Sequence, residues 1–156
     1  MGFLVWLEAT GLAEWARSSA EGYPSMITLH AFGMAIMVGL SLALDLRLLG
    51  WFNAIPYSGL QRFFGVGWLG FGINTLSGTA LFSMQATTYI TDWVFMTKMG
   101  CVFAGAVTAA ILQTSVGRDS AKWSAENPPG GVKALAGLGI AFWLTAITLG
   151  RLTAYL

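Results

Sequence analysis

The sequence predicts an all-α fold: an integral membrane four-helix bundle with an N-terminal interfacial amphipathic helix. Two observations lead to this class. Hydrophobic residues make up 56% of the 156-residue chain and charged residues only 10%, whereas soluble proteins carry about 25% charged residues. In addition, four separate segments are apolar over about 20 residues, the helical length that crosses the roughly 30 Å hydrocarbon core of a bilayer.

The four expected spans form a bundle over residues 23–156. They cover about 25–49, 63–84, 93–115 and 133–156. Pro24 stands at the start of the first span, where a helix tolerates a residue without an N–H group. Asp92 precedes the third span and is expected to act as its N-cap. The connection over residues 116–131 ends in a Pro-Pro-Gly-Gly helix breaker.

Residues 1–22 are predicted to form a short helix that lies on the outer leaflet. Leu4, Leu7 and Trp15 fall on one side of such a helix, and Glu14 lies towards the other. This is the pattern of an interfacial amphipathic helix. The asymmetry is modest, and a frayed tail is the alternative.

The distribution of basic residues predicts the orientation in the membrane. The connections after the first and third spans lie on one side, and they or the adjoining helix ends hold Arg47, Arg62, Arg118, Lys122 and Lys133. The other side has Arg17 in its tail, with Lys98 and Arg151 just inside the helix ends. Because basic residues are enriched on the cytoplasmic side, we expect a multi-pass protein of the bacterial inner membrane with both termini in the periplasm.

The charged and reactive residues exclude several functions. The formal net charge is only +1 and no lysine- or arginine-rich block is present, so nucleic acid is not an expected partner. The chain has one cysteine and one histidine, and it contains no catalytic motif of the metalloprotease or hydrolase kind. At most, we expect an electron-transfer subunit.

His30, the one histidine, lies about six residues into an otherwise apolar span. Lys98 occupies a similar depth in the third span, which runs in the same direction, and Arg151 reaches the same layer near the end of the fourth. Such side chains within a membrane need an anionic or coordinating partner. The sequence therefore predicts a binding site in the outer leaflet formed by His30, Lys98 and Arg151.

Haem b is the cofactor that this layer would suit. His30 would be the metal ligand, binding the iron axially, and Lys98 or Arg151 would pair with the propionates. The second axial position would fall to Lys98, to a methionine such as Met34 one turn after His30, or stay open. The alternative is structural, because Lys98 and Arg151 can reach lipid headgroups and His30 can bond to a helix backbone or to Thr28.

Sulfur-containing residues raise a second possibility, the handling of Cu(I). Met26, Met34 and Met37 share one stripe of the first span with His30. Met96, Met99 and Cys101 occupy the third span at similar depth. Thioether, thiolate and imidazole are the soft ligands that favour Cu(I), although methionine is also an ordinary filler of apolar cores.

Asp45 and Arg47 lie in the segment DLRLLG at the end of the first span. Being two residues apart, they do not share a helix face. We expect Asp45 to pair with a residue elsewhere at the cytoplasmic end, such as Arg62 or a loop donor, and Arg47 to meet lipid phosphates. Asn74 and Gln113 are expected to be buried amides that hydrogen-bond across helices.

Three segments carry a resemblance to a known family: WLEATGLAEWARSSAEGYPSMITLHAFGMAIMVGLSLALDLRLLG, SGTALFSMQATTYI and VFMTKMG. Together they resemble a bacterial family of small four-helix membrane proteins of unknown function, which share an early histidine in the first span and an early lysine in the third. More distantly, this layout is similar to the HemJ-type protoporphyrinogen oxidases and to the copper-resistance-D-type membrane proteins. The HemJ likeness implies that His30 and Lys98 are haem-associated positions.

The leading hypothesis is a haem b-binding membrane protein that transfers electrons to or from a periplasmic or membrane partner. The alternative is a non-catalytic structural or assembly subunit of a larger membrane complex, and Cu(I) handling is the second alternative. The expected partners are the lipid bilayer and, in a homo-oligomer or hetero-complex, other copies or other proteins.

Overall fold

The computed structural model describes residues 2–125 and 127–153, and within these residues the chain forms helices and no strand. The helices are α1 (Gly2–Glu8), α2 (Gly11–Ser18), α3 (Gly22–Leu48), α4 (Tyr57–Gln61), α5 (Phe64–Ser83), α6 (Ala86–Tyr89), α7 (Trp93–Ala125) and α8 (Gly130–Leu152). The all-α prediction is therefore confirmed.

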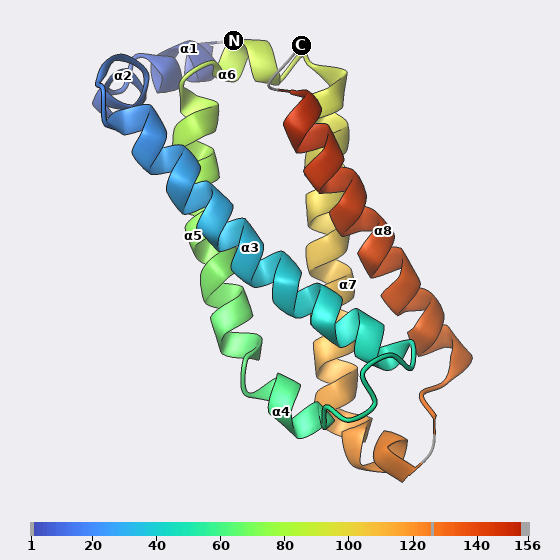
Figure 1. Ribbon diagram of the computed structural model, residues 1–156. Coiled ribbons are helices and arrows are strands. Elements are labelled where there is room, and N and C mark those ends of the chain that lie inside the picture. The colour runs from blue at the N-terminus through green and yellow to red at the C-terminus, as the bar shows by residue number, and fades with distance from the viewer. Residues whose placement is uncertain (1, 126, 154–156) are drawn as a thin grey trace.

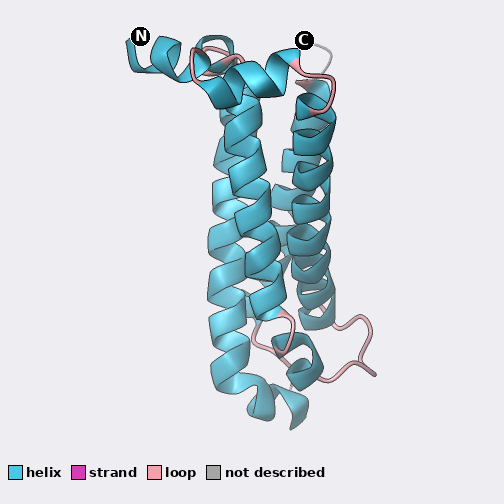
Figure 2. Cartoon of the chain, turned by 90° about the vertical axis from the view of Figure 1, so that its left-hand side faces the viewer, coloured by secondary structure: helices cyan, strands magenta, loops and turns pink. Residues whose placement is uncertain are grey.

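The long helices α3, α5, α7 and α8 run up and down the length of the molecule (Figure 1). The short helices α1, α2 and α6 lie across one end, close to the end of α8, and we call this the terminal end (Figures 1 and 2). Helix α4 and the connection between α7 and α8 lie at the opposite end, which we call the α4 end. Helices α3 and α7 run away from the terminal end, as expected for the first and third spans.

Three helical segments are long and apolar enough to cross a membrane: Gly22–Leu48, Trp93–Trp123 and Gly130–Leu152. These correspond to the first, third and fourth expected spans, although residues 154–156 of the fourth lie outside the described residues. Helix α5 matches the second expected span to within one residue at each end, but it is not in this set. Asn74 and the serines and threonines of α5 lower its mean hydropathy, because α8 has as many glycines and is in the set.

Helix α7 is longer than the sequence pattern suggested. We expected residues 116–131 to form a connection, yet α7 continues to Ala125. The predicted boundary is wrong, because the hydrophobicity of this segment falls before its helix ends. Residues 116–125 contain no proline, and the exposed Arg118 and Lys122 can be solvated on a helix that continues beyond the apolar stretch. The breaker acts only at Pro128 and Pro129.

Helices α3 and α5 pack in backbone contact. A Cβ atom added at Gly33 would lie 2.5 Å from the backbone nitrogen of Asn74 and 2.6 Å from the carbonyl oxygen of Gly70. Glycine at this crossing lets the two backbones approach closely, as in membrane helix pairs with small interface residues. On α5, Gly65 and Gly72 have no atom within 4 Å of an added Cβ. Only part of the glycine pattern of α5 therefore serves this contact.

Two hydrophobic clusters join the long helices. The middle cluster comprises Met37, Val38, Ala109 and Trp143. The cluster nearer the α4 end comprises Leu44, Leu48, Tyr57, Leu112, Val116, Trp123 and Ala136. Helix α3 contributes to both clusters, because it runs diagonally from α5 at the terminal end towards α8 at the α4 end (Figure 1).

The N-terminal segment forms two helices rather than one. Thr10 ends the first and caps the second, because its hydroxyl oxygen accepts a hydrogen bond from the Ala13 N–H. The buried face of α2 consists of Ala13 and Ala16, while Leu12 and Trp15 are exposed. The large apolar side chains therefore point away from the rest of the chain.

Candidate functional site

His30 bridges α3 and α5. Its Nδ1 atom lies 3.0 Å from the backbone oxygen of Asn74, and the Asn74 side-chain amide donates in return to the backbone oxygen of His30 at 2.8 Å. Because a carbonyl oxygen only accepts hydrogen bonds, Nδ1 carries the proton in this arrangement. The lone pair of a neutral ring is then on Nε2, which has no hydrogen-bond partner among the described residues.

A glycine and a serine of α5 shape the seat of the imidazole. A Cβ atom at Gly78 would lie 2.9 Å from Cε1 and 3.2 Å from Nδ1 of His30. The Ser77 hydroxyl is 3.4 Å from Nδ1 and donates to the backbone oxygen of Ile73. The hydrogen bond to a helix backbone that the structural alternative predicts is therefore present, although its acceptor is on a neighbouring helix and Thr28 takes no part. This hydrogen bond uses Nδ1 and leaves Nε2 without a partner among the described residues.

Lys98 and Arg151 lie at the same end of the molecule as His30, on α7 and α8. The Lys98 amine is 4.0 Å from the point where a Cβ at Gly150 would lie, so it packs beside the residue that precedes Arg151. It also lies 5.4 Å from the centre of the Phe95 ring. Lys98 is close enough to His30 for the two to interact electrostatically. Neither cation has an ion pair or side-chain hydrogen bond among the described residues.

Lys98 lies near a group of three stacked aromatic rings, those of Phe82, Tyr89 and Phe95. Phe95 stacks on Phe82 with ring centres 5.5 Å apart and on Tyr89 with ring centres 5.1 Å apart. Burial raises the pKa of the Tyr89 phenol, so this residue of α6 stays neutral at physiological pH. The surroundings of the Lys98 amine are therefore apolar and offer it no negative charge.

The sulfur residues do not gather into one set. Met34 is partly buried and packs against the middle cluster, to which Met37 belongs. Met96 and Met99 on α7 are instead 48% and 44% exposed. The positions of these methionines on α3 are those of core residues, whereas the two on α7 face outwards.

Asp45 and Arg47 have surroundings that differ from those expected. Asp45 is only 2% exposed, and no ion pair or hydrogen bond of its carboxylate is present in the described part of the chain, with Arg62 or with a loop donor. Arg47 is bound within the chain: its Nε donates to the backbone oxygen of Ile55 at 2.8 Å, and its guanidinium carbon lies 4.4 Å from the centre of the Tyr57 ring. Arg47 therefore holds the loop after α3.

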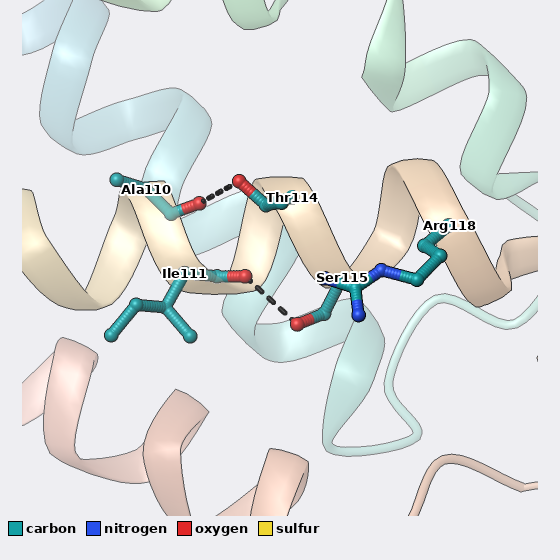
Figure 3. A pocket seen from close by; sticks show the side chains of 5 residues that line it. All are labelled: Ala110, Ile111, Thr114, Ser115 and Arg118. Carbon is teal, nitrogen blue, oxygen red and sulfur yellow. Dashed lines mark hydrogen bonds between the residues drawn. The ribbon is translucent and has the colours of Figure 1, made fainter.

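A shallow hollow of about 320 Å³ lies along α7 towards the α4 end, lined by Ala110, Ile111, Thr114, Ser115 and Arg118 (Figure 3). The Thr114 and Ser115 hydroxyls donate to backbone oxygens of the same helix, at 2.7 and 2.9 Å. The hollow is roughly three helical turns or more from Lys98 along α7. It adds nothing to the predicted site.

Some contacts of the site were foreseen and others were not. Asn74 and Gln113 do hydrogen-bond across helices as predicted, Asn74 to His30 and Gln113 to the Trp68 indole N–H at 2.8 Å. The contact of Gly78 with the imidazole was not predicted, because the sequence shows Gly78 only as one of several glycines that allow helices to pack closely. Within residues 2–125 and 127–153, no three histidine, cysteine or acidic side chains come together as a metal site.

No protein-family model, no curated protein and no solved structure matches this chain.

Proposed function

We propose that this chain is an integral membrane protein that binds haem b through His30 and transfers electrons to or from a periplasmic or membrane partner. The observation that supports this function is the bonding of the imidazole. Nδ1 is bonded to the Asn74 backbone oxygen, and Nε2 has no partner in the described part of the chain. Histidines that bind metals typically donate their other ring N–H to a carbonyl or carboxylate in this way.

The nearby cations fit the same group. Lys98 and Arg151 have no anionic partner among the described residues, and the propionates of haem b are two carboxylates. Haem supplies one-electron redox chemistry when it is bound. This chain's own residues would hold the ring on one side through His30, orient the propionates through Lys98 and Arg151, and exclude water through the surrounding apolar helices.

The test is a visible spectrum of the full-length protein purified in mild detergent from haem-replete cells. We expect a Soret band in the wild type and its loss in His30→Gln. Glutamine can still donate to the Asn74 carbonyl but lacks the ring nitrogen, so this variant separates haem ligation from the bridge between α3 and α5. Absence of the band in folded wild-type protein would overturn the haem function and leave the structural-subunit hypothesis.

The cations have a matched test. Lys98→Met removes a charge beside Gly150, and Lys133→Met removes one at the other end of α8. We expect the first to lower the haem content and shift the reduction potential, and the second to leave both unchanged. Equal effects of the two variants would contradict a role of Lys98 in holding the cofactor.

We further propose that α5 is a fourth span and that both termini face the periplasm of a bacterial inner membrane. The support is that α5 lies along α3 and that Arg47, Arg62 and Arg118 belong to the α4 end. In a Cys101→Ser background, Ala20→Cys and Thr88→Cys on α6 should react with a membrane-impermeant thiol reagent in spheroplasts, whereas Ser58→Cys on α4 should not. The opposite labelling would reverse the orientation, and equal labelling of Ser58→Cys and Thr88→Cys, on either side of α5, would remove α5 as a span.

A further inference from the structure

The buried Asp45 carboxyl lies where three helices meet. Its Oδ2 atom is 2.9 Å from the position that a Cβ at Gly139 of α8 would take, and the Thr108 hydroxyl oxygen of α7 is 3.4 Å from the same point. Asp45 is 2% exposed and Thr108 is 6% exposed. Glycine at 139 therefore leaves just enough room for a carboxyl group beside a hydroxyl.

No positive charge compensates this carboxyl within the described residues. On α3 the nearest base, Arg47, is held by Ile55 and Tyr57. Helix α5 has no titratable side chain over Phe64–Ser83. None of the remaining titratable groups of the helices packed around α3 forms an ion pair or hydrogen bond with Asp45 among the described residues. These groups are Glu14 and Arg17 of α2, Lys98, Cys101, Arg118, Asp119 and Lys122 of α7, and Lys133 and Arg151 of α8.

The hydrogen-bonding groups at the crossing are mismatched for an ionised carboxylate. The Thr108 hydroxyl donates to the backbone oxygen of Gly105 at 2.8 Å, so only its lone pairs remain for Asp45. A carboxylate also presents only lone pairs. An unpaired charge in such a place is strongly unfavourable, whereas a protonated carboxyl has an O–H group that can donate to the Thr108 hydroxyl oxygen.

A buried hydrogen-bond donor without a partner lies near the same crossing. The Trp143 indole N–H is the buried side-chain polar atom without a hydrogen-bond partner in the described part of the chain. Trp143 lies one turn beyond Gly139 on α8, and its ring packs against Gly105, one turn before Thr108 on α7. The buried unpaired atom is thus a donor, and the Asp45 oxygens, which are not in this fully buried class, keep slight contact with solvent.

We propose that Asp45 is a proton-binding site within the membrane-spanning part of the chain, where its carboxyl takes up a proton from water and holds it against the Thr108 hydroxyl oxygen. A metal ion is the less suitable occupant, because hard cations require several oxygen ligands and no group of three histidine, cysteine or acidic side chains comes together among the described residues. Asp45 lies one turn before the end of α3, so the proton exchanges with solution at the α4 end.

Infrared difference spectroscopy of the full-length protein in lipid nanodiscs tests this proposal. At neutral pH we expect the C=O stretching band of a protonated buried carboxyl, shifted in D₂O and removed by alkaline pH in a one-proton step. The band should be absent in Asp45→Asn and retained in the control Asp119→Asn. If folded wild-type protein shows no band that depends on Asp45, the proposal is wrong.

Two further measurements keep the result clear. If Asp45→Asn does not fold, Thr108→Val replaces it: the band should persist at a shifted frequency, because the carboxyl loses its acceptor, and an unchanged band would contradict the assigned contact. Addition of Na⁺ at fixed pH should leave the band unchanged. Its loss on addition of Na⁺ would identify a cation site and overturn the proton site.

Discussion

The Glu8 carboxylate and Thr87 join α1 to α6 by two hydrogen bonds, from the Thr87 backbone N–H and from its hydroxyl, both 2.8 Å long. These bonds, chiefly the one from the backbone N–H, lower the pKa of Glu8 below its usual 4.5. A carboxyl with a depressed pKa stabilises the docked state fully above pH 4.5, and this contribution is lost as the pH falls through the lower folded pKa. We therefore predict that α1 undocks from α6 in acid.

Hydrogen exchange of the Thr87 amide measures this docking. Protection should fall with acidification in the wild type, whereas Glu8→Gln should show lower protection at neutral pH and no further loss in acid. Glu14→Gln is the matched control, because the Glu14 carboxylate has no hydrogen bond in the described part of the chain. A wild-type protection that does not vary with pH would contradict the prediction.

Gly33→Ala should destabilise the packing of α3 on α5. The new methyl group would lie 2.5–2.6 Å from backbone atoms of Asn74 and Gly70, and backbone cannot move aside as a flexible side chain can. We expect a cost of about 1–3 kcal/mol, the usual range for overpacking, measured by reversible unfolding in mixed detergent micelles. Gly39→Ala on the same helix meets nothing within 4 Å and should be neutral or slightly stabilising.

Gly78→Ala should disturb the imidazole of His30 without removing any polar group. Its methyl group would lie 2.9 Å from Cε1, so the ring must turn away from the Asn74 carbonyl. Because the chain has one histidine, nitrogen-15 NMR reports its tautomer without assignment. We expect the Nδ1-protonated form in the wild type and in Gly72→Ala, and a mixture of tautomers in Gly78→Ala.

Arg47→Lys should loosen the loop between α3 and α4. Arginine donates to Ile55 and, at 3.0 Å, to the Asn53 side chain while it stacks on Tyr57, and a lysine cannot reproduce this planar set of contacts. We expect a loss of about 1 kcal/mol, seen as faster proteolysis in the loop. Arg62→Lys, at an exposed site, should have no such effect.

The sequence pattern predicted the helices better than their ends. Apolar length located α3, α5 and α8 to within a few residues, because the polar or proline-containing segments between long apolar runs leave few places where a helix can end. The N-cap of α7 was also predicted, and Asp92 does accept a hydrogen bond from the Val94 N–H at 2.9 Å. The continuation of α7 to Ala125 was not predicted, because a helix exposed to water needs no continuous apolar stretch and hydropathy alone does not reveal it.

The contacts of single polar residues were harder to predict. Hydropathy placed His30 and Lys98 at similar depth, but depth alone does not say which neighbouring helix each side chain meets. Asp45 shows this most clearly: the spacing in the sequence predicts a partner such as Arg62 or a loop donor at the cytoplasmic end, whereas the packing of α8 on α3 places the carboxyl against Gly139. Helix rotation decides such contacts, and a single sequence does not specify it.

Helix α3 carries both the His30 imidazole, which contacts α5, and the Asp45 carboxyl, which contacts α8. His30 and Asp45 are roughly 22 Å apart along the axis of one continuous helix, so a small turn of that helix moves both at once. The effects of two distant substitutions on the free energy of unfolding usually add. Here both residues belong to one rigid helix, so a movement of α3 changes the surroundings of both. We expect a double-mutant cycle of His30→Gln and Asp45→Asn, followed by reversible unfolding, to show a coupling energy that two sites at this separation ordinarily lack.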